Sequence, residues 1–322
     1  MLALMTMYAF LDPFGVVRKH ANYYTDNRHV TLNRDFVSLE MFEKNFPRYQ
    51  YDSFILGNSR SIFYEWKDWA KCITSDKIFH FDAASESLLG INLKLKYLGN
   101  RCSISNCLIV LDRSALTIVT NQESHIFAKH YRLSGQNPLA FQWKFFAAFL
   151  DKHFLWAFLD FKLHHRFRSS MSDVLEARIW DYDPAHNELS LHSTVEAEIG
   201  QGRYYQESAR SFPPRDEVKR YADAVIGPQQ ARLLMEMREI LDRQKSNYRL
   251  VVSPLYDQVK LAPVDIETLR TVFGEDKVFD FSGVNELTSS VENYYETSHY
   301  RPVVARAIMS ILYKGNDLRV SR

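Results

Sequence analysis

A serine and a histidine at opposite ends of this sequence have the neighbours that a nucleophile and its base require. Ser59 follows the apolar run 54–57 (FILG), which predicts a strand that stops at a glycine. His299 stands three residues after Glu296, so this carboxylate can hold Nδ1 of the imidazole and direct Nε2 towards a serine. A hydroxyl, an imidazole and a carboxylate together predict ester hydrolysis or acyl transfer.

Each of these residues also has a purely structural interpretation. Asn58 and Ser59 are residue types that cap a following helix, because their side chains accept hydrogen bonds from its first N–H groups. His299 is flanked by aromatic residues and can simply pack against them. Arg60 either binds an anionic group of a substrate or lies on the surface of the first helical turn. Gly57 allows a tight turn and leaves room for a substrate carbonyl.

The elements that must position these residues alternate between strand and helix near both ends of the chain. This order predicts right-handed βαβ units and a mainly parallel sheet with helices on both faces. Active sites of such sheets lie at the carboxyl ends of the strands, where Ser59, Asp112 and the loop of His299 all fall. The expected strands are 51–56, 77–81, 107–111, 248–253 and 278–281, and the expected helices are 61–69, 85–98, 228–243, 264–273 and 302–312.

The middle of the chain interrupts this order, and we interpret about 121–227 as an insertion of helices and a hairpin. Before the first strand, residues 12–50 show no strong period and are expected to form an extended segment. Within the insertion we expect a loop at 121–140, one aromatic helix at 141–161, a β-hairpin at 177–193 and a polar loop at 194–213.

Composition limits the functions that remain. The chain has 322 residues, of which 46% are hydrophobic and 14% aromatic, so it can bury a large core. A net charge of +1 provides no field for nucleic acid, which we exclude as a partner. No metal-ligand spacing is present, since His164 and His165 lack suitable partners. Cys72, Cys102 and Cys107 are read as small buried residues, and a pairing of Cys102 with Cys107 stays open.

Two apolar segments suggest contact with a membrane. Residues 1–11 (MLALMTMYAFL) are shorter than the roughly 20 residues of a spanning helix, and they lack a signal-peptide pattern. We favour the end of a membrane anchor over a helix packed on the domain, and divide the chain into an anchor segment, 1–20, and one domain, 21–322. The aromatic stretch with its basic end, 141–168, either caps the sheet, which we favour, or lies at a lipid interface.

The two motifs resemble the SGNH (GDSL-type) hydrolase superfamily. There a serine after a Gly-Asp or Gly-Ser pair meets a late Asp-x-x-His, as Gly57-Asn58-Ser59 and Glu296-Thr297-Ser298-His299 would here. Segments 278–283 (VFDFSG) and 293–302 (NYYETSHYRP) are similar to membrane-anchored bacterial SGNH-like proteins of cell-envelope acylation, such as alginate O-acetylation proteins and the teichoic-acid D-alanylation protein. The resemblance covers about 51–112 and 230–313.

The resemblance implies a fold, a substrate class and a location. The fold is a three-layer α/β/α domain with a five-stranded flavodoxin-like sheet, and the reaction needs no metal or cofactor. By this resemblance the substrate would be an acylated cell-envelope or exported polysaccharide. The protein would work at the extracytoplasmic face of the envelope, anchored to or associated with the membrane, with a membrane acyltransferase as an expected partner.

The sequence departs from the family pattern at the acid and at the oxyanion hole. Glu296 replaces the usual Asp, and the regions after the second and third strands lack the family's glycine and Gly-x-Asn-Asp. The hole would rest on the N–H of Ser59 and that of Ala84 or Ser85, with Asp112 nearby. Losing a side-chain donor lowers the rate by roughly 10²–10³. A catalytically degenerate binding or assembly component of an envelope complex is therefore the alternative.

Overall fold

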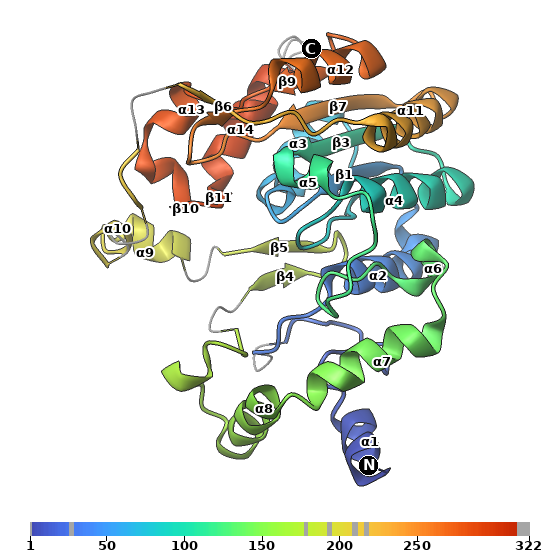
Figure 1. Cartoon of the computed structure of the whole chain (residues 1–322), viewed down its shortest axis with the longest axis vertical. Helices are drawn as coiled ribbons and strands as arrows, with labels where there is room; N and C mark the ends of the chain where they lie inside the picture. The colour runs from blue at the N-terminus through green and yellow to red at the C-terminus, as the bar shows by residue number, and fades with distance from the viewer. Residues whose placement is uncertain are drawn as a thin grey trace.

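A five-stranded, all-parallel sheet forms the centre of the protein (Figure 1). The computed structural model describes residues 2–25, 29–176, 180–191, 195–207, 212–215 and 219–313. The strand order β2-β1-β3-β7-β9 corresponds to the 2-1-3-4-5 order of flavodoxin-like sheets. The predicted α/β fold is thereby confirmed. The strands are β1 (Ser53–Gly57), β2 (Ile78–His80), β3 (Asn106–Leu111), β7 (Asn247–Val252) and β9 (Val278–Asp280).

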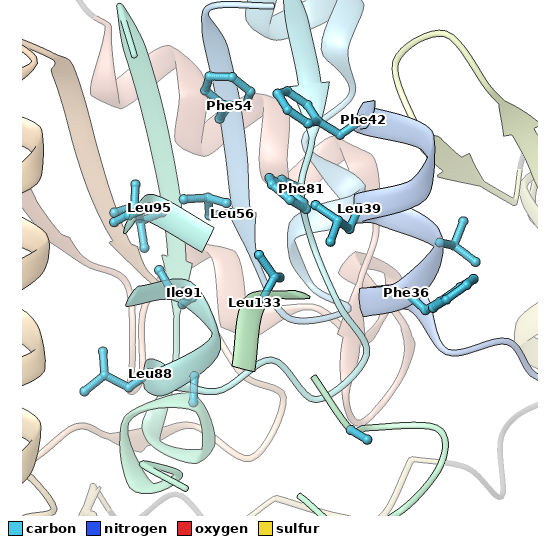
Figure 2. Close-up of a cluster of buried hydrophobic side chains, with 14 of the residues drawn as sticks. Phe36, Leu39, Phe42, Phe54, Leu56, Phe81, Leu88, Ile91, Leu95 and Leu133 are labelled. Carbon is cyan, nitrogen blue, oxygen red and sulfur yellow. The ribbon is translucent and has the colours of Figure 1, made fainter. Parts of the chain in front are cut away.

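Helices cover both faces of the sheet, which makes the domain three-layered. Alternate strand residues point to opposite faces, so Phe54 and Leu56 join one hydrophobic cluster and Ile55 joins the other. Figure 2 shows part of the first cluster, in which side chains of α2 and α4 meet those of β1. The first face carries α2 (Arg34–Tyr49), α4 (Leu88–Arg101), α11 (Pro228–Arg243) and α12 (Pro263–Phe273), and the second carries α3 (Trp66–Ile73) and α14 (Pro302–Leu312).

Several expectations for local structure were wrong. The loops expected at 121–140 and 194–213 contain short helices, α6 (Tyr131–Ser134) in the first and α9 (Ala197–Gly200) and α10 (Tyr204–Glu207) in the second. The segment before the first strand is not extended throughout, because Asn33 caps α2, accepting a hydrogen bond from Phe36 N at 2.8 Å. The aromatic stretch is two helices, α7 (Pro138–Phe149) and α8 (Lys152–His164), since Asp151 caps the second. The helix expected at 61–69 is a 3₁₀ turn, η1 (Ser61–Phe63), followed by α3.

The insertion packs beside the sheet and below it in Figure 1. The predicted hairpin is present as β4 (Asp181–Asp183) and β5 (Glu188–Ser190), and His80 of β2 donates its N–H to His186 O at 2.9 Å. Residues 177–179, 192–194 and 208–211 of the predicted hairpin and polar loop lie outside the described residues. The helix α5 (Arg113–Thr117) precedes the insertion. The other elements of the insertion are α6 (Tyr131–Ser134), η2 (Ser169–Met171), α9 (Ala197–Gly200), α10 (Tyr204–Glu207) and β6 (Arg220–Tyr221).

The first described helix, α1 (Leu2–Leu11), packs on α7, where the ring of Tyr8 lies 5.4 Å from those of Phe146 and Phe149. Within the described ranges, no helix combines the length and apolarity that crossing a bilayer requires. All three cysteines are free thiols. Five short elements complete the C-terminal part of the described chain, which also contains β9 and α14. They are β8 (Val259–Lys260), α13 (Glu286–Ser289), η5 (Val291–Asn293), β10 (Tyr294–Glu296) and β11 (His299–Tyr300).

Candidate active site

Ser59, His299 and Glu296 meet at the carboxyl edge of the sheet. Ser59 Oγ lies 2.7 Å from His299 Nε2, although the two residues are 240 positions apart. Nδ1 of the same ring is hydrogen-bonded to Glu296 Oε1, and Glu296 Oε2 accepts the N–H of Ser298 at 2.7 Å. The carboxylate therefore fixes a tautomer that leaves Nε2 free to accept the serine proton. The His299 side chain is 27% exposed, so a substrate can reach it.

The end of β1 presents Ser59 through a turn that only glycine permits. Gly57 has a φ of +151°, and a Cβ at this position would lie 2.6 Å from Val110 O in the adjacent β3. The chain then turns into η1, since Asn58 O accepts hydrogen bonds from Ser61 N at 2.9 Å and Ser61 Oγ at 2.7 Å. The serine thus stands on a short turn anchored at both ends rather than on a mobile loop.

A small hairpin of β10 and β11 carries His299 and Glu296. The strands pair antiparallel with an irregularity in the register between Tyr294 and Glu296. Tyr300, beside the histidine, is fully buried, and its hydroxyl lies 3.4 Å from that of Tyr64. The His299 ring meets the edge of Phe63 with ring centroids 5.8 Å apart. Buried tyrosines thus hold the hairpin against the second face of the sheet.

Asn58, Arg60 and Asp112 bind one another beside the serine. Both Asn58 Nδ2 and Arg60 Nη1 donate to Asp112 Oδ2 at 2.5 Å, and Arg60 Nε donates to Ser298 O at 2.8 Å. Burial alone would raise the pKa of Asp112, but the Arg60 guanidinium and nearby donors hold that pKa below its ordinary value. Asn58, Arg60 and Asp112 thus form a hydrogen-bonded group that connects the turn of Ser59 to the loop of His299.

The turn after β2 supplies the other predicted residues, Ala84 and Ser85. Ala83 N donates to Gly57 O at 3.2 Å, which holds this turn beside the end of β1. Ser85 is exposed with a φ of +48°. Across the described residues, the N–H groups of Ser59, Ala84 and Ser85 have no protein acceptor. These N–H groups have no competing acceptor, whereas the side-chain amide of Asn58 donates to Asp112.

One contact that sequence reasoning missed joins the insertion to the hairpin that carries His299. Glu196 accepts hydrogen bonds from Arg301 Nη2 at 2.8 Å and from the Tyr295 hydroxyl at 2.6 Å. Burial and the adjacent Glu196 raise the pKa of Tyr295. Arg301 lies in the segment NYYETSHYRP, which the sequence had already singled out. The sequence around Glu196 gives no sign that this residue pairs with an arginine 105 positions away.

In the part of the chain that the structure describes, no group of three His, Cys, Asp or Glu side chains is arranged to hold a metal. His164 of the predicted histidine pair is half exposed and lies 2.8 Å from Asp160.

Comparisons of the sequence with protein-family models and with curated proteins find no match. The roles of Ser59, His299 and Glu296 therefore rest on their geometry and chemistry.

Proposed function

We propose that this protein is an SGNH-like serine esterase or O-acyltransferase that acts on an acylated cell-envelope or exported polysaccharide. The observation that carries the proposal is the 2.7 Å approach of Ser59 Oγ to His299 Nε2, with Glu296 bonded to the other ring nitrogen. A serine that merely capped a helix would have no reason to meet a carboxylate-bound imidazole from the far end of the chain.

The reaction proceeds in two acyl transfers. Ser59 Oγ attacks the ester carbonyl while His299 Nε2 takes its proton, and the oxyanion accepts hydrogen bonds from the N–H of Ser59 and of Ala84 or Ser85. The tetrahedral intermediate collapses, the C–O bond to the leaving alcohol breaks, and the imidazolium returns the proton to that oxygen. Water gives hydrolysis of the acyl-enzyme, and a sugar hydroxyl gives acyl transfer.

An open site supports a polymeric acceptor. The side chains of His299 and Glu296 are 27% and 25% exposed, so the reacting atoms lie near the surface rather than at the bottom of a tunnel. A chain that cannot enter a closed cavity can still present an ester or a hydroxyl to such a site. The polysaccharide, the membrane acyltransferase partner and the extracytoplasmic location come from the sequence resemblance alone.

The competing proposal is a binding or assembly component with a degenerate site. This alternative is supported by the weak oxyanion hole proposed above, whose donors are all backbone N–H groups. The side chain of Asn58 does not contribute a donor, because its amide is hydrogen-bonded to Asp112. The two proposals make opposite predictions for the reactivity of Ser59.

Active-site labelling with a fluorophosphonate tests the proposal. We expect covalent modification of Ser59, mapped by mass spectrometry, and hydrolysis of p-nitrophenyl acetate that Ser59→Ala abolishes. Ser170→Ala removes an exposed hydroxyl on η2 and serves as the matched control, which should label and hydrolyse as the wild type does. Equal hydrolysis by wild type and Ser59→Ala, with no labelled serine, would refute the enzyme and leave the binding component.

A further inference from the structure

Three helices at one end of the molecule expose apolar side chains. α1, α7 and α8 gather at the lower end of Figure 1, opposite α12. Fourteen large hydrophobic side chains are exposed among the described residues, and half of them belong to these three helices. We call this set the apolar end, and it contains Leu2, Met5, Phe10, Leu139, Trp143, Trp156 and Leu163.

The exposed residues form stripes on their helices. Leu139 and Trp143 stand four residues apart on α7, and Trp156 and Leu163 stand seven apart on α8, so each pair shares a helical face. α1 has no charged residue, and Tyr8 is its one buried side chain. A helix that is apolar all round is ordinarily covered, and clustered exposed apolar residues mark a contact surface.

Basic side chains outnumber acidic ones in the segment that contains α7 and α8. Residues 139–168 include five lysines and arginines against two aspartates, and one of these, Asp160, already lies 2.9 Å from Arg168. Lys162 and Arg166, at the end of α8, are exposed. A groove of about 550 Å³ beside Trp156 is lined by Lys152 and His153 together with Asp160. The charge at this end therefore favours a partner that carries anionic groups.

We propose that the apolar end binds the surface of an anionic lipid bilayer. Tryptophan rings prefer the headgroup level of a membrane, and basic residues beside them meet lipid phosphates. Trp143 and Trp156 would enter this level, with α1 alongside and Lys152, Lys162 and Arg166 facing the phosphates. Contact with a second copy of the protein would also bury the exposed apolar side chains. Such a contact would leave the basic side chains Lys152, Lys162 and Arg166 without a role.

Vesicle flotation of the full chain tests this proposal. We expect wild type to float with mixed phosphatidylcholine–phosphatidylglycerol vesicles and to bind phosphatidylcholine alone more weakly. The double variant Trp143→Ser/Trp156→Ser should lose roughly tenfold in partitioning for each tryptophan. Each of Lys152→Gln, Lys162→Gln and Arg166→Gln should cost roughly fivefold on anionic vesicles. Binding should survive Ser59→Ala, which separates this surface from the proposed chemistry.

Matched controls make the outcome decisive. Met235→Ser removes a 51% exposed apolar side chain from α11, outside the apolar end, and should bind as wild type does. Leu139→Ser/Leu163→Ser repeats the test if loss of the tryptophans disturbs folding, as judged by circular dichroism. Wild type that stays out of the floating fraction, or a double tryptophan variant that binds normally, would overturn the proposal. Self-association lost in the tryptophan variant, without vesicle binding, would assign the surface to a second copy instead.

Discussion

Arg60 donates a hydrogen bond of 2.8 Å to the main-chain carbonyl of Ser298, the residue immediately before His299. The same guanidinium lies 2.5 Å from Asp112 at the end of β3. One side chain thus ties the loop of the base to the sheet edge that presents the nucleophile. We therefore expect Arg60 to help set the distance between Ser59 and His299.

Replacing Arg60 should therefore slow the reaction without unfolding the protein. Arg60→Gln removes the charge pair with Asp112 and leaves the loop of His299 free to shift. A misplacement of about 1 Å can cost about 100-fold, so we expect kcat for p-nitrophenyl acetate to fall roughly 10- to 100-fold. Arg60→Lys keeps the charge but cannot bridge both acceptors, and should recover only part of the loss.

Arg113→Gln is the matched control for this experiment. Arg113 is exposed on α5 and donates to Asp223 O at 3.2 Å, away from the loop of His299. Its variant should retain wild-type kcat. A wild-type kcat in Arg60→Gln would show that the contacts of Arg60 with Asp112 and Ser298 do not position His299.

Glu296 makes a second prediction, because it holds both the ring and the loop. Its Oε1 binds His299 Nδ1 and its Oε2 accepts from Ser298 N at 2.7 Å. Glu296→Gln keeps the shape but removes the charge that stabilises the imidazolium, and should lower kcat about 10²–10⁴-fold. Glu296→Asp retains the charge with a shorter reach, and should lose less. Steady-state kinetics and the rate of fluorophosphonate labelling would check both, and equal activity of Glu296→Gln and wild type would remove the carboxylate from the mechanism.

The lowered pKa of Asp112 predicts how the free energy of unfolding depends on pH. Its pKa in the folded protein lies below the ordinary value, so its contribution is present above the unfolded pKa of about 4 and is lost as pH falls through the folded pKa. Asp112→Asn should lower the free energy of unfolding by about 3 kcal/mol at neutral pH, because Arg60 loses its counter-charge. The difference from wild type should shrink below about pH 4. Urea unfolding at several pH values measures it, and a difference independent of pH would contradict the ion pair.

The sequence was informative wherever a short segment carries its own signal. An apolar run stopped by Gly57, and a carboxylate three residues before His299, are local patterns, and the structure brings Ser59, His299 and Glu296 together at the predicted edge. The sheet followed from the alternation of strands and helices. The catalytic roles stay predictions.

The wrong expectations have two causes, which are a local signal outweighed by its surroundings and pairing over long distances. Asp151 is a recognisable cap, with its Oδ1 3.0 Å from both His153 N and Phe154 N, but the continuous aromatic run around it favoured one helix. α2 was missed because its buried side includes Arg34, Asp35 and Glu40, which blur a helical period of apolar residues. The partners that neutralise these charges lie far away in the sequence, as with Arg34 and Asp82.

The buried charges beside α2 give the last prediction. Lys94 Nζ lies 2.5 Å from Glu86 and 3.2 Å from Asp35, and a second lysine, Lys129, lies 2.5 Å from Glu86, with all four side chains buried. Burial opposes the charge on Asp35, but the two lysines hold its pKa below the ordinary value. Two cations and two anions balance, so removing one cation leaves an unpaired buried charge.

Lys94→Met should therefore lower the free energy of unfolding by about 3–5 kcal/mol, measured in urea. Adding Glu86→Gln restores the balance between one cation and one anion, so the double variant should be more stable than Lys94→Met alone. Lys96→Met is the control on the same helix, since Lys96 is 47% exposed and its pair with Glu236 should contribute less than about 1 kcal/mol. If Lys94→Met costs no more than Lys96→Met, the four side chains do not act as a charge-balanced group.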